Sequence, residues 1–448
     1  MNNESAVADR GGAVCVVGAG AAGLAAVKNL REHGFDVDCY ERETGVGGLW
    51  NWRHERSPVT AATHLISSRP MTEFPDFPMP DHWPDYPHHR QAREYLERYA
   101  THFELSRDIW FGTEVTWVNP TPDLRWDVTT ASTGGDAPGR VTRYDALVVA
   151  NGHHWHPVRP HYPGQDGYPG RVLHAGECKE PDRLRGLRVL VVGGGNSAAD
   201  LAVALAGQAA ACWYSTRRGY WLYPKYLHGR PVDQAGARLR AAPLPRRWRQ
   251  RIAARILHRA VGPPERYGLP RPDHPPLAAH PTVNSQLPHH IGHGLITPVP
   301  DIERFDGKVV HLTDGRTIDP EVVVLATGYR PRYDFLPGSL LGDDERPRLG
   351  LHVFAPEQPT LAVVGLPQTA GGMWPGMHWQ SVAVARWLRL WHADPVRAAA
   401  VRPTLFAAGD FAAPTVDTPR HHAEVDPHRY LLALQALLDR MAAPAAAR

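Results

Sequence analysis

The most constraining feature of this sequence is a glycine pattern that lies directly between an apolar strand and a helix. The run Ala13–Val17 is short and rich in β-branched residues, as is typical of a strand buried on both faces. Gly18, Gly20 and Gly23 follow it with the spacing G-x-G-x-x-G. The first glycine allows a tight turn, the second lets a pyrophosphate approach the backbone, and the third allows the helix to pack closely on the strand. The helix N-terminus also directs free N–H groups at phosphates, so the stretch predicts a dinucleotide site.

A carboxylate ends the second strand of this unit. Phe35–Tyr40 is predicted to be that strand, and Glu41 follows it directly. An acid at this place is suited to bind the ribose hydroxyls of an adenine nucleotide. Because the strand, the helix and the acid all stand where binding needs them, we favour a dinucleotide site over an ordinary glycine-rich turn. Ala22, in the first helical turn, completes the predicted contacts of this first site.

The same pattern occurs again in the middle of the chain. Arg188–Val192 is a second buried strand, and Gly193, Gly195 and Ala198 follow it as G-x-G-x-x-A. The spacing predicts a helix over 197–206. Residues at the start of that helix are assigned to a second nucleotide: Asn196, Ser197 and Asp200.

The two sites differ in the residue that follows the second strand. The acid of the first site lies 23 residues after the first glycine of its pattern, and the same offset in the second pattern leads to Thr216. No carboxylate stands there, and Arg217 and Arg218 come next. The group that would repel a 2′-phosphate is missing, and two guanidinium groups that can bind one are present. The first site should therefore bind FAD, and the second NADPH rather than NADH.

The composition narrows the class of protein. The chain has 448 residues, enough for two or three packed domains, and its net charge of +3 gives no indication of a nucleic-acid partner. Its four cysteines form no C-x-x-C pair, which argues against a redox-active dithiol and a secreted disulfide framework. No apolar signal region opens the sequence, and no run approaches the length of a membrane span. We expect a soluble, cytoplasmic protein, and a homodimer is left open.

A histidine group and a basic segment each have two interpretations. His153, His154 and His156 lie in a proline-rich loop without a cysteine or carboxylate cluster, so no metal site is predicted. The segment 236–261 has eight arginines and no acid, and Trp248 stands one helical turn before an isoleucine. A basic amphipathic helix can bind a membrane surface. An insert docked by one face, with its charges in water, is commoner, and we favour it.

Periodicity predicts the remaining elements. We expect helices over 91–102, 380–391 and 430–441, and strands over 115–117, 126–129, 146–150, 321–325 and 361–364. Turn residues predict hairpins around 133–139 and at Asp314-Gly315. The segment 281–294 is predicted to be a loop, in which we place Asn284 and Ser285 near a nicotinamide.

The linker before the second glycine pattern carries a more specific signal. Tyr168, Gly170, His174 and Cys178 have the spacing of the F-x-G-x-x-x-H-x-x-x-[Y/F] signature of flavin-containing monooxygenases. Further similar pieces are GGLW from Gly47, FPDFPMP from Phe74, ATGY from Ala326 and the helix around Gln380. From about residue 14 to 387 the chain resembles these single-component, FAD- and NADPH-dependent enzymes, a class that includes Baeyer–Villiger monooxygenases.

This resemblance implies an α/β fold with two Rossmann-like dinucleotide-binding domains, in which the NADPH domain is inserted into a discontinuous FAD domain. The expected ranges are 1–165 for the first part of the FAD-binding domain, 166–320 for the NADPH-binding domain with a helical insert, and 321–448 for the second part of the FAD-binding domain with C-terminal helices. The strand at 321–325 is thus expected to return the chain to the FAD domain.

The resemblance also implies an activity. NADPH would reduce FAD, O₂ would add to flavin C4a, and the resulting hydroperoxide would pass one oxygen to a nitrogen or sulfur nucleophile of a small molecule. Side chains would position the cofactors and exclude water. Three alternatives remain open: Baeyer–Villiger oxygenation of a ketone, an uncoupled NADPH oxidase that releases H₂O₂, and a flavin-binding redox sensor.

Site residues follow from the same resemblance. Ile66 stands at the position of the family's active-site Asn, beside Ser67, and this departure keeps the oxidase alternative open. His174 is expected to join the domains by a hydrogen bond or to contact a cofactor, and these three are the candidate catalytic positions. The N-terminus of the helix 380–391 is expected to face the flavin. Further cofactor contacts are expected at Gly48, Leu49, Trp50, Val115, Thr327, Gly328 and Gln368.

Overall fold

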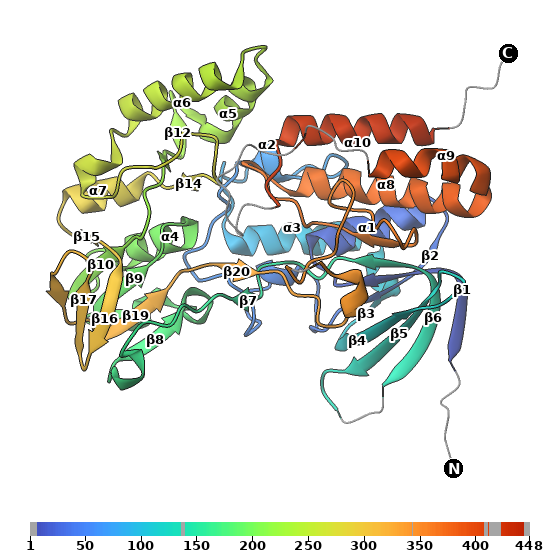
Figure 1. The fold of residues 1–448 in the computed structure, drawn as a ribbon, viewed down its shortest axis with the longest axis horizontal. Helices are drawn as coiled ribbons and strands as arrows, with labels where there is room; N and C mark the ends of the chain where they lie inside the picture. The colour runs from blue at the N-terminus through green and yellow to red at the C-terminus, as the bar shows by residue number, and fades with distance from the viewer. Residues whose placement is uncertain (1–6, 136–138, 343, 407–410, 412–422, 443–448) are drawn as a thin grey trace.

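The computed structural model describes residues 7–135, 139–342, 344–406, 411 and 423–442. Within these ranges two sheets with parallel strands lie side by side, and helices cover them (Figure 1). This is the expected α/β class. No helix of the described ranges combines the length and the hydropathy that crossing a bilayer requires.

The first sheet joins parallel strands to an antiparallel meander. Its strand order in the described residues is β3 (Ile109–Trp110), β2 (Asp36–Tyr40), β1 (Ala8–Val17), β6 (Arg140–Val149), β5 (Trp126–Ser132) and β4 (Thr113–Pro120), and β21 (Leu361–Val363) pairs with β6 off this path. β6 belongs to both parts, because it pairs with β5 over residues 140–144, with β1 between residues 142 and 149, and with β21 over residues 147–149. The predicted hairpin between β5 and β6 is confirmed, and 136–138 at its tip lie outside the described residues.

The second sheet is parallel throughout. Its order is β15 (Thr297–Val299), β10 (Ala211–Ser215), β9 (Arg188–Val192), β19 (Val322–Leu325) and β8 (Arg171–His174). β19 therefore lies between β9 and β8, with Val322 opposite both Val189 and Arg171. The expectation that 321–325 returns the chain to the first unit is wrong, since this buried VVVL run is an inner strand of the second sheet.

Four small strand groups complete the topology of the described residues. They are β11 (Leu222–Tyr223) with β14 (Thr282–Val283), β12 (Tyr226–Leu227) with β13 (Arg230–Pro231), β16 (Ile302–Asp306) with β17 (Val309–Leu312) and β18 (Thr317–Ile318), and β7 (His156–Pro157) with β20 (Tyr329–Arg330). The antiparallel pairing of β17 with β18 confirms the hairpin predicted at Asp314-Gly315.

The helices fall into two groups (Figure 1). Those around the first sheet are α1 (Ala21–Glu32), α2 (Arg69–Thr72), α3 (His89–His102), α8 (Trp374–Ala393), α9 (Pro395–Leu405) and α10 (Pro427–Met441). Those of the second part are α4 (Asn196–Leu205), α5 (Val232–Ala241), α6 (Arg246–Ala260) and α7 (Gln286–Gly292). Short 3-10 turns are η1 (Gly48–Trp50), η2 (Leu105–Asp108), η3 (Gln165–Gly167), η4 (Ala175–Glu177), η5 (Pro181–Leu184), η6 (Pro264–Tyr267) and η7 (Gly338–Leu340).

Two predicted segments have a different structure. The segment 281–294 contains β14 and α7, because the Oδ1 atom of Asn284 accepts the N–H groups of Gln286 and Leu287 (2.9 and 2.8 Å) and so caps the helix. The helix predicted from residue 380 already begins at Trp374, with Pro375 in its first turn, where the missing N–H of proline has no cost.

The basic segment forms α5 and α6. In α6 only Ala253 and Leu257 are buried. Trp248 is 47% exposed, so the buried face of the helix is not the one on which the sequence pattern places Trp248. The helix buries the apolar side chains of Ala253 and Leu257, whereas most of its arginines are exposed. This agrees with the insert docked by one face.

The two connections between the sheets pair with each other. β7 follows β6, β20 follows β19, and Tyr329 stands opposite Pro157 in antiparallel register. Both lie at the centre of the view in Figure 1, between the two sheets. The Oγ1 atom of Thr327 donates to the carbonyl of Val158 (2.6 Å), which fastens the connection at its start.

Candidate functional site

The first glycine turn joins β1 to α1 and is built almost wholly from backbone. Gly18 has a φ of +98°, and a Cβ there would lie 2.8 Å from the carbonyl oxygen of Ala150. A Cβ on Gly23 would overlap the carbonyl oxygen of Gly18. The helix therefore sits directly on the turn, as the predicted spacing requires.

A second glycine loop packs on this turn. The N–H of Gly47 donates to the carbonyl of Ala19 (3.1 Å), and a Cβ on Gly48, whose φ is +53°, would lie 2.9 Å from the Cα of Gly20. Two backbone segments thus meet with no side chain between them, a surface on which a phosphate or a flat ring can lie. Trp50 follows in η1 and meets the ring of Trp374 edge to face, with centroids 6.3 Å apart.

Glu41 is held in position at the same place. Its Oε2 accepts the N–H of Ala19 (2.7 Å) and its Oε1 accepts that of Glu43 (2.9 Å). Burial raises the pKa of the carboxyl group, and the two N–H donors oppose that shift. Each carboxylate oxygen has a further lone pair, so ribose hydroxyls can still bind it.

Two positions that the sequence analysis did not single out lie beside this turn. Asn51 is 4% exposed, and its Oδ1 has no hydrogen-bond partner within the described ranges. Gly365 follows β21 with a φ of +90°, and a Cβ there would lie 2.8 Å from the Cβ of Ala22. A buried acceptor and a close backbone approach fit a bound dinucleotide. The glycine after a buried strand was a usable signal for Gly365, whereas nothing in the pattern marked Asn51.

The second glycine turn has the same construction. Gly193 has a φ of +140°, and a Cβ there would overlap the carbonyl oxygen of Ala326. Thr282 covers the turn by donating its hydroxyl to the carbonyl of Gly194 (2.9 Å), and Asn196 accepts the N–H of Val283 (2.8 Å). Asn196 therefore holds the covering strand β14.

The residues after β10 are not equivalent. Thr216 is 3% exposed, and its Oγ1 has no partner among the residues that the structure describes, which fits a polar contact to a nucleotide. Arg217 and Arg218 are both exposed. Arg218 forms an ion pair with Asp273 (3.3 Å), whereas no carboxylate of the described chain pairs with Arg217. Arg217 is thus the guanidinium group that is available to a 2′-phosphate.

Asp200 and Asn284 bind each other. The Nδ2 of Asn284 donates to Oδ1 of Asp200 (2.9 Å), and burial raises the pKa of Asp200 to about 6. Because the other end of the Asn284 amide caps α7, both ends are engaged. The second N–H group of Nδ2 is the part of the Asn284 amide left for the predicted nicotinamide contact, and Ser285 accepts the N–H of Lys225 (2.8 Å).

The three candidate catalytic positions do not share one environment. His174 is buried, donates from Nε2 to the carbonyl of Gly328 (3.2 Å) and accepts the N–H of Gly176 at Nδ1 (3.4 Å). Burial lowers the pKa of the ring, which favours its neutral form. The ring thus holds the chain between β19 and β20 through Gly328, and its expected role in joining the domains stays a prediction. Ile66 is half-buried and Ser67 is buried, in the segment before α2.

The other predicted cofactor residues have varied surroundings. Val115 lies in β4 opposite Thr130, with its side chain in the core of the meander. The N–H of Gln368 donates to the carbonyl of Ala423 (2.7 Å). Gln380 lies inside α8 and binds Gly365 and Tyr430, so it is not at a helix N-terminus as predicted.

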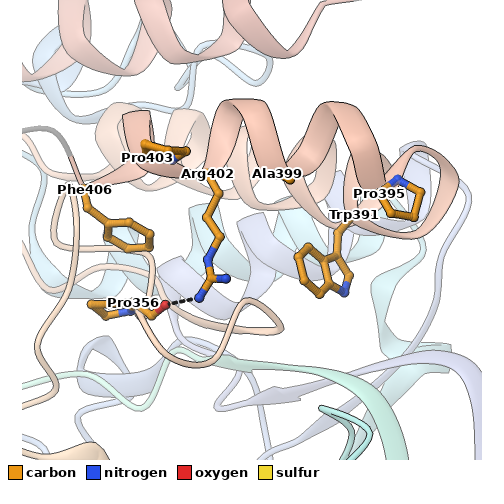
Figure 2. Close-up of a pocket in the computed structure, with 7 residues that line it drawn as sticks. All are labelled: Pro356, Trp391, Pro395, Ala399, Arg402, Pro403 and Phe406. Carbon is orange, nitrogen blue, oxygen red and sulfur yellow. Dashed lines mark hydrogen bonds between the residues drawn. The ribbon is translucent and has the colours of Figure 1, made fainter.

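A cavity of about 540 Å³ lies elsewhere, beside α8 and α9 (Figure 2). Its lining includes Trp391 and Arg402, whose guanidinium group donates to the carbonyl of Pro356 (2.6 Å). None of the predicted site residues lines it, so this cavity is separate from both glycine turns.

Comparison with known proteins agrees with this geometry. The family model "Flavin-binding monooxygenase-like" matches residues 11–400. The chain is 34% identical to rat flavin-containing monooxygenase 5 over 81% of this chain and 70% of the relative. It is also 34% identical to mouse dimethylaniline monooxygenase [N-oxide-forming] 2, over 84% and 72% of the two chains. S-allyl-L-cysteine S-oxygenase from Allium sativum has the same fold, with a TM-score of 0.65, 21% identity, and coverage of 97% and 89%.

The family match spans both glycine turns, both connections between the sheets and the helix α8. The buried Asn51 and Thr216 acceptors and the backbone surfaces at Gly20 and Gly48 fit the two nucleotides that such enzymes use. The chain therefore belongs to the flavin-binding monooxygenase-like family, and it is a flavin-dependent monooxygenase that uses FAD and NADPH.

Proposed function

We propose that this enzyme transfers one atom of O₂ to a nitrogen or sulfur atom of a small molecule, while the second atom leaves as water and NADPH is oxidised to NADP⁺. The observation that carries the proposal is the pair of glycine turns with different residues on the ribose side, Glu41 at the first and Thr216-Arg217 at the second. The N-oxide named for the mouse relative supports nitrogen as an acceptor.

We also propose that each turn belongs to one nucleotide domain. The first sheet would form the FAD domain, and the second sheet would form the inserted NADPH domain. The paired strands β7 and β20 mark the two boundaries, near residues 157 and 329, so the second boundary lies after β19 rather than at residue 321. His174 would then lie in the NADPH domain and hold the chain just before the second boundary, through Gly328.

In this proposal the side chains and the backbone bind the two cofactors, orient them and shield them from water. Glu41 would bind the ribose of FAD. The backbone at Gly20 and Gly48, which has no side chains, would let the nucleotide lie close to it. Arg217 would hold the 2′-phosphate of NADPH. When bound, the two cofactors supply hydride transfer and oxygen activation, so no side-chain nucleophile is required.

The strongest second candidate is an NADPH oxidase. Ile66 is half-buried at the position where the resemblance places an amide, and its side chain has no hydrogen-bonding atom. A site that cannot bind the activated oxygen through that amide would release more of it as H₂O₂. A Baeyer–Villiger reaction on a ketone is the third outcome to be tested.

The deciding experiment supplies ¹⁸O₂ and NADPH to the FAD-loaded enzyme with a panel of tertiary amines, sulfides and cyclic ketones. We expect one ¹⁸O atom in an amine or sulfide product, measured by mass spectrometry. The amounts of NADPH consumed and of H₂O₂ released are measured in the same reactions. An ester from a ketone would establish the Baeyer–Villiger alternative. Recovery of all NADPH equivalents as H₂O₂ with every compound would overturn the proposed function in favour of the oxidase.

A further inference from the structure

The segment Leu65–Ser68 carries two candidate catalytic positions, and side chains from a distant part of the sequence bind its backbone. The Nζ of Lys225 donates to the carbonyl of Leu65 (3.0 Å). The Oδ2 of Asp233 accepts the N–H of Ser68 (2.6 Å). Ser68 is fully buried and Asp233 is 7% exposed. Hydrogen bonds with an ionised partner are the stronger class, and here one fastens each end of the segment.

Lys225 is itself held by several contacts. Its N–H donates to Ser285, and its carbonyl accepts the N–H of Val232 (3.0 Å) and the hydroxyl of Tyr86. Its ammonium group lies 4.2 Å from the centroid of the Tyr86 ring. The side chain is therefore fixed in one direction, toward Leu65, rather than free in solvent.

The same network reaches the second glycine turn. β11 pairs with β14, and the N–H of Asn284 donates to the carbonyl of Tyr223 (2.9 Å), two residues before Lys225. Asn284 also binds Asp200 in α4, and Asn196 at the start of α4 binds Val283 in β14. Side chains that lie next to the predicted NADPH site thus connect to the Leu65–Ser68 segment.

We propose that Lys225 and Asp233 are positioning residues that hold the Leu65–Ser68 segment in place and thereby lower the share of activated oxygen that is lost as H₂O₂. The proposal rests on the proposed monooxygenase function, because the segment is assigned to the active site by the position of Ile66 in the family. With Ile66 in place of an amide, shape and water exclusion must come from the segment as a whole. Loss of either contact leaves a buried backbone group unpaired, so the segment shifts and water enters.

The first test is hydrogen exchange on the FAD-loaded, full-length enzyme without NADPH. Lys225→Met removes the donor and keeps the stem, Asp233→Ala removes the acceptor, and Lys225→Arg keeps a donor. The control is Lys308→Met, since Lys308 is exposed in the β16–β17 turn. We expect exchange in a peptide covering 65–68 to become at least tenfold faster in Lys225→Met and Asp233→Ala, with peptides covering 13–41 unchanged. Unchanged protection of 65–68 in both variants would overturn the proposal.

The second test follows the oxygen. The fraction of NADPH recovered as H₂O₂ should rise at least threefold in Lys225→Met, with the KM for NADPH within twofold of wild type and with Lys225→Arg close to wild type. A raised KM with an unchanged H₂O₂ fraction would place Lys225 in NADPH binding and refute the proposal. If wild type releases only H₂O₂, the proposed function fails, yet the exchange experiment still decides whether the two residues hold the segment. If Asp233→Ala loses FAD, Lys225→Met decides alone.

Discussion

At the scale of single residues, the absence of a side chain is as informative as its presence. At Gly23 the helix α1 contacts the carbonyl oxygen of Gly18, so a methyl group on Gly23 must push the helix and the turn apart. Overpacking of this kind costs about 1–3 kcal/mol, and here it would distort the backbone that we propose binds the phosphates of FAD. Gly23→Ala should therefore purify with little FAD, measured as flavin absorbance per protein. Gly292→Ala, at an open position of α7, is the control, and a normal flavin content in Gly23→Ala would contradict the assignment.

The two arginines after β10 should differ in their effect on cofactor choice. Arg217→Ala should raise the KM for NADPH roughly tenfold or more, because a charge-assisted contact is worth about 1.5–3 kcal/mol, and it should leave NADH kinetics nearly unchanged. Arg218→Ala should have a smaller effect, since its guanidinium group is paired with Asp273. Equal losses for NADPH and NADH would refute the 2′-phosphate assignment.

Asp200 should make stability depend on pH. Its pKa of about 6 in the folded protein exceeds the unfolded value near 4, so between these pH values the folded state binds more protons than the unfolded state. Stability from this group is present at low pH and is lost as pH rises from about 4 to about 6. Asp200→Asn should therefore melt higher than wild type at pH 7.5 and show no such gain at pH 4. Melting curves whose difference does not change with pH would contradict this.

At the scale of elements, short apolar runs identified strands reliably. Arg188–Val192 was predicted with the bounds that β9 has, because a buried parallel strand needs an unbroken apolar run. Loops and the first residues of helices were predicted less well from the sequence. The cap at Asn284 and the proline in the first turn of α8 act through side-chain or steric effects that periodicity does not register.

The connection formed by β7 and β20 gives a test of His174. His174→Ala leaves the N–H of Gly176 without its acceptor, at a cost of about 1–3 kcal/mol, and it leaves the carbonyl of Gly328 with the N–H of Val158 as its remaining donor. We expect a lower melting temperature and a pH–rate profile of unchanged shape. The loss of a titrating limb from the profile of kcat would instead indicate acid-base chemistry at this ring.

At the scale of the whole molecule, two sheets with separate cores are tied together at a few defined places. The paired connections β7 and β20 form one tie. The contacts of Lys225 and Asp233 with the Leu65–Ser68 segment form another. The C-terminal helix α8 packs against α1, and α9 and α10 pack against α8, which closes the first core (Figure 1). Each glycine turn therefore lies on its own sheet, and the candidate catalytic segment lies where the second part contacts the first.

The order of residue types along the chain was enough to predict the two glycine turns, Glu41, the basic residues after β10 and most strands, because steric limits on φ, close backbone approach and apolar periodicity are local properties. Long-range packing was needed to place β19 in the second sheet, to pair Arg218 with Asp273, and to bring Lys225 and Asp233 to the segment before α2. These contacts join residues from 55 to 165 positions apart. The spacing of residue types along the chain encodes no such partner, since the partner depends on how whole elements pack.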